Sequence, residues 1–364
     1  MALRMNRIVL LLLVAVAMAG MIVDIWIGKE EMFEDFGRKL VNEQKTNVYG
    51  EAHQDSTKTK EGELTVEADA IQSVSLTGWH GDIDVKPADG KTIRLRYKIT
   101  VTAPSEEAAD RKLAKLKVGD TREGEGLTLA AALGGEPVED GEISLDYELQ
   151  LPAGLKLIVK NQYGALTIAD TKGDLDVQLG SGMLEIAGVR GQIAADVSYS
   201  NVYLHDLTGS VALKNDTSDI NMEDVRGALQ LESDNGVNYI RSVDGPVTGR
   251  AEQGSVVLSD SGDTDLSVVA GNVQLVGMKG DARIRPESSD VTVMLDEGAG
   301  YALDVSVQDG GIRTRLPLPI ERDSQNVGLK RLRGTVGDGA KSIAIDGVAS
   351  DIHLYTHAAE PQKN

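Results

Sequence analysis

Hydrophobic and polar residues alternate from residue 163 to about residue 295, inside a longer repeat of about eighteen residues. Aliphatic side chains predominate at four fixed offsets from a repeated glycine, and Asn238 is the polar exception at the first of these offsets. Period-two alternation predicts β-strands, and a fixed repeat of this length predicts a solenoid. The repeated glycines, each eighteen residues after the last, are Gly173, Gly191, Gly209, Gly227 and Gly245.

A second column of small or polar residues precedes each repeat. Glycine, asparagine and aspartate tolerate a positive φ angle, so this column predicts chain corners. We therefore expect an all-β fold, a single-stranded parallel β-helix of about 18 residues per coil, with successive coils about 4.8 Å apart. The predicted corner residues are Gly164, Gly182, Asn201, Asp219, Gly236, Gly254, Gly271 and Asp290.

Strand-like alternation also fills residues 63–160, interrupted by one helix predicted near residues 105–117. Ser105 is a suitable N-cap, and Glu106 and Glu107 favour the positive end of a helix. Further on, Pro317 and Pro319 exclude a central strand between them. We divide the chain into a cytoplasmic stub with a transmembrane anchor (1–28), a juxtamembrane helix and linker (29–62), a strand-rich entry segment (63–160), β-helix repeats (161–297), C-terminal coils and cap (298–356) and a tail (357–364).

An apolar run at residues 8–27 is long enough to span a bilayer as a helix. Arg4 and Arg7 precede it, and acidic residues follow it, so the positive-inside rule places the N-terminus in the cytoplasm and the main domain outside the cell membrane. The alternative is a signal peptide cleaved near Ala19, which would release a secreted protein. Both interpretations export the body of the chain.

Composition excludes several classes of function. The formal charge of −20 argues against nucleic-acid binding, which needs a basic surface. The absence of cysteine excludes disulfides and thiolate chemistry. The five histidines lack zinc-ligand spacing, and no Gly-x-Ser-x-Gly nucleophile motif occurs. We therefore predict no catalytic residue, no resident metal and no cofactor.

Two small groups of residues remain as candidate sites. Asp206 and Asp224 are expected one coil apart and would together hold a cation such as calcium, or simply bond their own backbone at turns. Tyr203, Asn221 and Tyr239 are expected on one outward face, where exposed rings stack on sugars or anchor a partner protein. The alternative for the tyrosines is the ordinary preference of tyrosine for strands.

Several short motifs resemble those of the bacterial putative-adhesin β-helix family, over about residues 63–356. That family is a domain of unknown function in envelope-associated proteins, often membrane-anchored, and the resemblance supplies no catalytic residue. The motifs are Leu151–Gly154, Tyr163–Ile168, Gly182–Ile186, Gly337–Gly339 and Ala349–Leu354.

These observations favour a non-enzymatic, membrane-anchored extracytoplasmic β-helix that presents an interaction surface, as an adhesin, an envelope scaffold or a modulator of an envelope-stress sensor. The expected partners are an envelope glycan or another envelope protein. One alternative is a glycan-cleaving β-helix enzyme that acts on cell-wall or extracellular polysaccharide. Another is a solenoid that assembles end to end.

Overall fold

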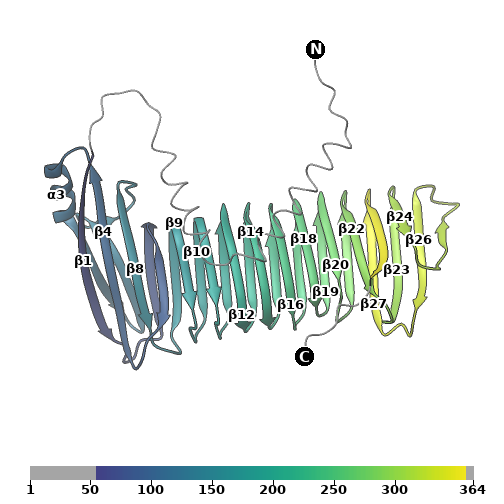
Figure 1. Ribbon diagram of the computed structural model, residues 1–364, viewed down its shortest axis with the longest axis horizontal. Helices are drawn as coiled ribbons and strands as arrows, with labels where there is room; N and C mark the ends of the chain where they lie inside the picture. Colours follow the sequence, from purple (N-terminus) through teal and green to yellow (C-terminus); the bar gives the residue numbers. More distant parts are fainter. Residues whose placement is uncertain (1–54, 358–364) are drawn as a thin grey trace, which may run out of the picture. The chain divides into compact units, whose positions relative to one another are not determined.

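The computed structural model describes residues 55–357, which form two rows of paired strands that face each other and extend coil by coil (Figure 1). Row A runs in the order β5 (Leu116–Glu123), β6 (Gly126–Leu133), β2 (Ser73–His80), β9 (Lys156–Ala169), β10 (Leu175–Ala187), β11 (Ile193–Ser198), β13 (Val211–Asp216), β15 (Leu229–Ser233), β17 (Val247–Ala251), β19 (Thr264–Val269), β21 (Ala282–Glu287), β27 (Lys341–Val348), β23 (Tyr301–Gln308), β26 (Leu329–Val336) and β25 (Ile320–Arg322). The short β7 (Glu136–Pro137) pairs with the end of β6.

Row B is the second row, and its strands carry the candidate site. The long strands β9 and β10 belong to both rows. Row B runs in the order β1 (Ser56–Glu67), β4 (Thr92–Ala103), β8 (Ile143–Leu151), β3 (Ile83–Pro87), β9, β10, β12 (Ser200–Thr208), β14 (Asp219–Arg226), β16 (Val237–Val243), β18 (Gly254–Ser261), β20 (Gly271–Val276), β22 (Asp290–Asp296), β28 (Asp351–His357) and β24 (Gly311–Thr314).

The coils are parallel and repeat as predicted. Ile193 lies opposite Val211, and Val211 lies opposite Leu229, so the register advances by eighteen residues per coil. The aliphatic columns point between the rows and are buried; Leu184 and Val202, for example, are 0% and 1% exposed. The prediction of a parallel β-solenoid is thus confirmed for the central coils.

The repeated glycines are required by the close approach of one coil to the next. A Cβ atom on Gly209 would lie only 1.9 Å from the carbonyl oxygen of Gly191, a contact that no side chain can make. The predicted corner column is displaced in some coils. Tyr199 and Thr217 have positive φ angles, two positions before the predicted corners at 201 and 219.

Asn238, the polar exception of the repeat, lies fully buried in a hydrogen-bonded network. Its Nδ2 donates to Ser233 Oγ at 3.1 Å and to the Ser255 carbonyl at 3.3 Å. In the preceding coil, Asn215 donates to the Ser218 carbonyl at 2.9 Å and accepts from the Ser218 N–H at 2.8 Å. Because each buried polar group has a partner, these residues are tolerated inside an aliphatic core.

Helix α3 (Glu106–Lys115) packs against β1 and β4 at the N-terminal end, close to the predicted range. The Ser105 side chain accepts from the Ala108 N–H at 3.2 Å, which confirms the predicted N-cap. Strand β1 begins at Ser56, inside the segment that we expected to be a linker through residue 62, so that part of the prediction is wrong. Its polar sequence lacks a hydrophobic period, and its strand conformation depends on pairing with β4.

The C-terminal coils do not follow sequence order in space. The last coil, β27 and β28, lies between the coil of β21 and β22 and the coil of β23 and β24. Figure 1 shows these yellow strands between green strands that precede them in sequence. The chain therefore first forms the outer coil of β23 and β24, turns back through β25 and then β26, which pair antiparallel, and finally inserts its last coil.

Within residues 55–357, no helix is both long enough and apolar enough to cross a membrane. The predicted anchor at residues 8–27, the alternative cleavage near Ala19 and the tail from residue 358 lie outside the described residues.

Candidate functional site

Tyr203, Asn221 and Tyr239 lie side by side on the outward face of row B. Tyr203 is the register partner of Asn221, and Asn221 is the partner of Tyr239, on the adjacent strands β12, β14 and β16. All three side chains are exposed, Tyr203 to 39% and Tyr239 to 55%. The structure therefore brings together the residues that the sequence placed on one face, with the backbone positions of the two tyrosines two coils, or about 9.6 Å, apart.

The three residues belong to a longer outward line of side chains, and we call its part from β1 to β16 the row B line; the register continues beyond Tyr239 to Val257. Each member is the register partner of the next, and the entry segment contributes the first four members. In order, the line is Glu63, Arg96, Glu148, Asp84, Thr167, Glu185, Tyr203, Asn221 and Tyr239.

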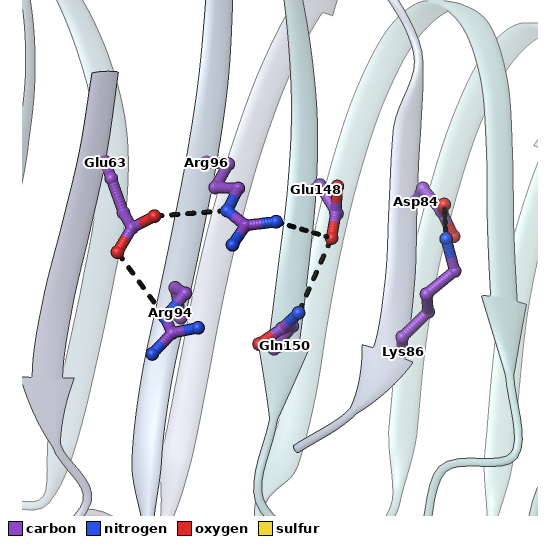
Figure 2. Close-up of polar contacts among 7 residues, drawn as sticks. All are labelled: Glu63, Asp84, Lys86, Arg94, Arg96, Glu148 and Gln150. Carbon is purple, nitrogen blue, oxygen red and sulfur yellow. Dashed lines mark hydrogen bonds and ion pairs between the residues drawn. The ribbon is translucent and has the colours of Figure 1, made fainter. Parts of the chain in front are cut away.

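The first part of the row B line is a network of ion pairs (Figure 2). Arg96 donates from Nε to Glu63 at 3.1 Å and lies 3.6 Å from Glu148 through Nη1. Arg94 approaches the other oxygen of Glu63 at 3.4 Å. These side chains are roughly half exposed, so each pair stabilises the fold by only about 0–1 kcal/mol. The network mainly fixes the positions of the charges on the surface.

A second pair lies on β3, at the inner end of this network. Lys86 hydrogen-bonds to Asp84, and that bond raises the pKa of the Lys86 ammonium despite the opposing effect of desolvation. Gln150 donates to Glu148 at 3.5 Å, which links the amide to the same carboxylate that Arg96 contacts. Figure 2 shows the seven side chains on four neighbouring strands.

A shallow hollow of about 840 Å³ lies over this part of row B. Its lining includes the aspartates Asp82 and Asp146, and both accept backbone hydrogen bonds. Asp82 Oδ1 accepts from the Ala165 N–H at 2.8 Å, and Asp146 Oδ1 accepts from the Asp82 N–H at 3.2 Å. These carboxylates hold neighbouring coils together, which gives them a structural role.

The same use of aspartate recurs along the solenoid, and sequence reasoning missed it. Asp174 accepts from the N–H of Gln192 at 2.8 Å, and Asp263 accepts from the N–H of Asp281 at 2.9 Å, each one coil further on. Some of the many aspartates therefore accept hydrogen bonds from backbone N–H groups of the next coil. The available signal was an aspartate directly after a corner glycine, as in Gly173–Asp174 and Gly262–Asp263.

Asp206 and Asp224 occupy neighbouring corners, as the sequence predicted. They belong to a column whose members all adopt a left-handed conformation, which is the role expected of aspartate at a turn. Asp206 contacts His205 Nδ1 at 3.0 Å, and residues 55–357 contain no group of three or more His, Cys, Asp or Glu side chains placed to hold a metal ion. The column consists of Asp170, Gly188, Asp206, Asp224, Ser242 and Asp260, with φ angles from 51° to 65°.

The row B line runs across the strands from a charged region on β1, β4, β8 and β3 to an aromatic region on β12, β14 and β16. Phenol rings separated by an amide offer flat apolar faces together with hydrogen-bonding groups, the combination that binding surfaces use. Thr167 and Glu185 add a hydroxyl and a carboxylate between the two regions. The arrangement suits an elongated ligand that lies along the solenoid.

Comparison with known proteins identifies the family. The chain is similar to the solved structures of a putative cell adhesion protein from Clostridium sporogenes (13% identity, 82% of this chain and 100% of that chain, TM-score 0.21) and a putative adhesin from Bacteroides fragilis (12% identity, 81% and 97%, TM-score 0.31). No curated protein matches it. The model of the family described as Toastrack DUF4097 matches residues 114–355, well over half of the chain. In agreement with the resemblance noted in the sequence, this chain belongs to the Toastrack DUF4097 family, a domain of unknown function.

Proposed function

We propose that this protein is a non-enzymatic, membrane-anchored extracytoplasmic adhesin that binds an envelope or extracellular glycan along the row B line. The observation that carries the proposal is the exposed row of side chains formed by Tyr203, Asn221 and Tyr239 on three adjacent coils. Tyrosines on strands about 9.6 Å apart suit the repeat of a linear polysaccharide that lies along the solenoid. The apolar run at residues 8–27 supports the anchor.

The charge of the protein narrows the class of glycan. A formal charge of −20 repels a polyanionic polymer. The carboxylate of Glu185, on the row B line beside Tyr203, favours amines or hydroxyls as partners. The proposed ligand is therefore a neutral glycan or one that carries free amino groups.

The carboxylates of the hollow give no support to the glycan-cleaving alternative. Acid–base cleavage of a glycoside needs two carboxyl groups free to exchange protons with the substrate. Asp82 and Asp146 bond backbone N–H groups, Glu63 and Glu148 contact arginine, and Asp84 pairs with Lys86. Glu61 is the one remaining carboxylate that lines the hollow, and a single carboxyl group does not make an acid–base pair. The contacts of the other carboxylates give them a structural role, and binding of a glycan requires no acid–base chemistry.

The test measures binding of full-length protein in detergent to fractionated envelope polysaccharides. Changing Tyr203 and Tyr239 together to alanine is expected to weaken binding about thirtyfold, because an exposed anchoring ring contributes at least about 1 kcal/mol. Changing both to phenylalanine keeps the rings and most of the affinity. A control double change of Gln230 and Thr248 to alanine, on exposed positions of row A, leaves binding unchanged.

Three results would overturn this proposal. Undiminished glycan binding by the double alanine variant would remove the tyrosines from the site. New reducing ends in the polysaccharide would favour the enzyme. Exclusive capture of an envelope protein, with no fraction of glycan bound, would assign the surface to a protein partner. Protease accessibility on intact cells, together with N-terminal sequencing for a chain that begins at Gly20, separates the anchored form from the secreted form.

A further inference from the structure

Strand β1 forms a long edge at the N-terminal end of row B. It pairs with β4 through twelve register positions, from Ser56 opposite Ala103 to Glu67 opposite Thr92. No other strand among residues 55–357 pairs with β1. The edges at the opposite end are much shorter, with four residues in β24 and three in β25. A long unpaired edge offers a row of backbone donors and acceptors to another extended chain.

The outward charges alternate in sign from strand to strand towards this edge. Strand β8 is acidic, β4 is basic and β1 is acidic, and direct cross-strand partners carry opposite charges. Such pairs contribute about 0.2–1 kcal/mol each, so the alternation favours correct pairing. The alternating partners are Asp146, Lys98 and Glu61 on one line, and Glu148, Arg96 and Glu63 on the next.

The pattern leaves acidic side chains at the edge without a basic strand beyond them. The side chain of Glu61 makes no ion pair or hydrogen bond within the part of the chain that the structure describes. Glu67 accepts only from Thr92 Oγ1, at 3.2 Å. On the other face of the same stretch, Leu64 and Val66 are partly buried against the core and present apolar side chains near the edge. The next strand in this pattern would be basic outside and apolar inside.

Contacts of α3 distinguish the two halves of β1. Lys58 on the first half lies 3.6 Å from Glu106 and 4.0 Å from Asp110, so the helix is held against this half of the strand. The second half, from Glu61 to Glu67, forms no ion pair with the helix among residues 55–357, and Glu63 pairs instead with Arg94 and Arg96. Figure 1 shows α3 beside one end of β1 and the rest of the strand at the margin of row B.

We propose that the edge from Glu61 to Glu67 binds an extended protein segment in which lysine or arginine alternates with apolar residues. The segment adds a strand beside β1, with its basic side chains next to Glu61 and Glu67 and its apolar side chains next to Leu64 and Val66. A second copy of β1 is a poor occupant, because antiparallel self-pairing sets glutamates against one another on the outward face. Glu63 belongs both to this edge and to the row B line, but the tyrosines that carry the glycan proposal lie on β12 and β16, so either proposal can fail alone.

The test uses full-length protein in detergent and a fluorescent peptide of about eight residues that alternates lysine with valine. The control peptide replaces each valine by proline, which keeps the charge and removes alternate backbone donors. We expect the first peptide to bind at least about tenfold more tightly, equal to 1.4 kcal/mol, and to slow hydrogen exchange in Glu61–Glu67. Equal affinity of the two peptides would overturn strand addition.

Charge variants complete the test. Changing Glu61 and Glu67 to lysine is expected to weaken binding at least about tenfold, since it places like charges beside the peptide. The matched control changes Glu232 and Glu287, which are exposed on row A, to lysine. It alters the net charge equally and is expected to leave the affinity for the peptide within about twofold. Equal losses in both variants would reduce the effect to net charge and overturn the proposal. Protection of β1 that appears without peptide and grows with protein concentration would show a second copy at the edge and overturn it too.

Discussion

The inserted C-terminal coil makes a sharp prediction about stability. Ile345 on β27 is 1% exposed and lies between its register partners Ile284 on β21 and Val305 on β23. Replacement by alanine removes three buried carbons, which costs about 2.4 kcal/mol at about 0.8 kcal/mol each. The remaining cavity adds to this, so the expected loss is about 3–4 kcal/mol.

The assay is urea unfolding of the full-length protein, followed by circular dichroism. With a slope of about 3 kcal/mol per molar urea, the midpoint falls by about 1 M. Hydrogen exchange is expected to accelerate most in β23 and β24, which reach the rest of row A and row B through β27 and β28. Exchange in β11, far along the row, changes little.

The matched control is Ile320→Ala on β25, where the same side chain is 39% exposed. Because about three-fifths of this side chain is buried and its loss leaves no enclosed cavity, the expected change is about 1.5 kcal/mol, roughly half of that at Ile345. If Ile345→Ala unfolded at the midpoint of Ile320→Ala or of the parent, β27 would not be an interior strand. The order of the C-terminal coils given above would then be refuted.

Three further changes test other parts of the structure. Asn215→Leu is expected to lower the free energy of unfolding in urea by about 3 kcal/mol, because it leaves the buried N–H and carbonyl of Ser218 without their hydrogen-bond partner. An unchanged urea midpoint would contradict the buried hydrogen-bond network. Tyr147→Phe is expected to stabilise by about 1 kcal/mol, because the buried hydroxyl has no partner in the described residues and burial raises its pKa; destabilisation would reveal a hidden partner. The Lys112 ammonium, 2.7 Å from Asp140, holds the pKa of that carboxyl below its usual range, so its stabilisation is present above the unfolded pKa of about 3.9 and is lost as the pH falls through the folded value. Lys112→Met should therefore lower the melting temperature near neutral pH and differ less from the parent in strong acid; a gap that widens in acid would contradict this sign.

The repeat itself could be predicted because its causes are local in sequence. One coil has to cover the next, so Ile193, Val211 and Leu229 recur at one interval and face the same core. The close backbone contact at Gly209 repeats for the same reason. The outward position of Tyr203 and Tyr239 follows from the same period combined with strand alternation.

Other features could not be predicted because they depend on partners distant in sequence. Strand β1 has no hydrophobic period, and only its pairing with β4 makes it a strand. The coil that contains Ile345 has the same aliphatic pattern as any other coil, so the pattern does not say between which neighbours it lies. Asn238 looked like a defect in the repeat until the buried partners Ser233 and Asn215 were known. The first part of the row B line could not be predicted either, because it crosses the antiparallel strands β1, β4 and β8, which lie outside the repeat.

The two ends of the solenoid differ in a way that bears on self-assembly. End-to-end stacking requires the last strands of one molecule to continue onto the first strands of another with a matching length and direction. The C-terminal end offers four residues in β24 and three in β25, whereas the N-terminal end offers twelve residues in β1 and eight in β5. Most of the β1 edge would then lack a partner, at a cost for each backbone group shielded from water. The mismatch argues against an end-to-end polymer and leaves the acidic edge from Glu61 to Glu67 accessible to a partner of different sequence.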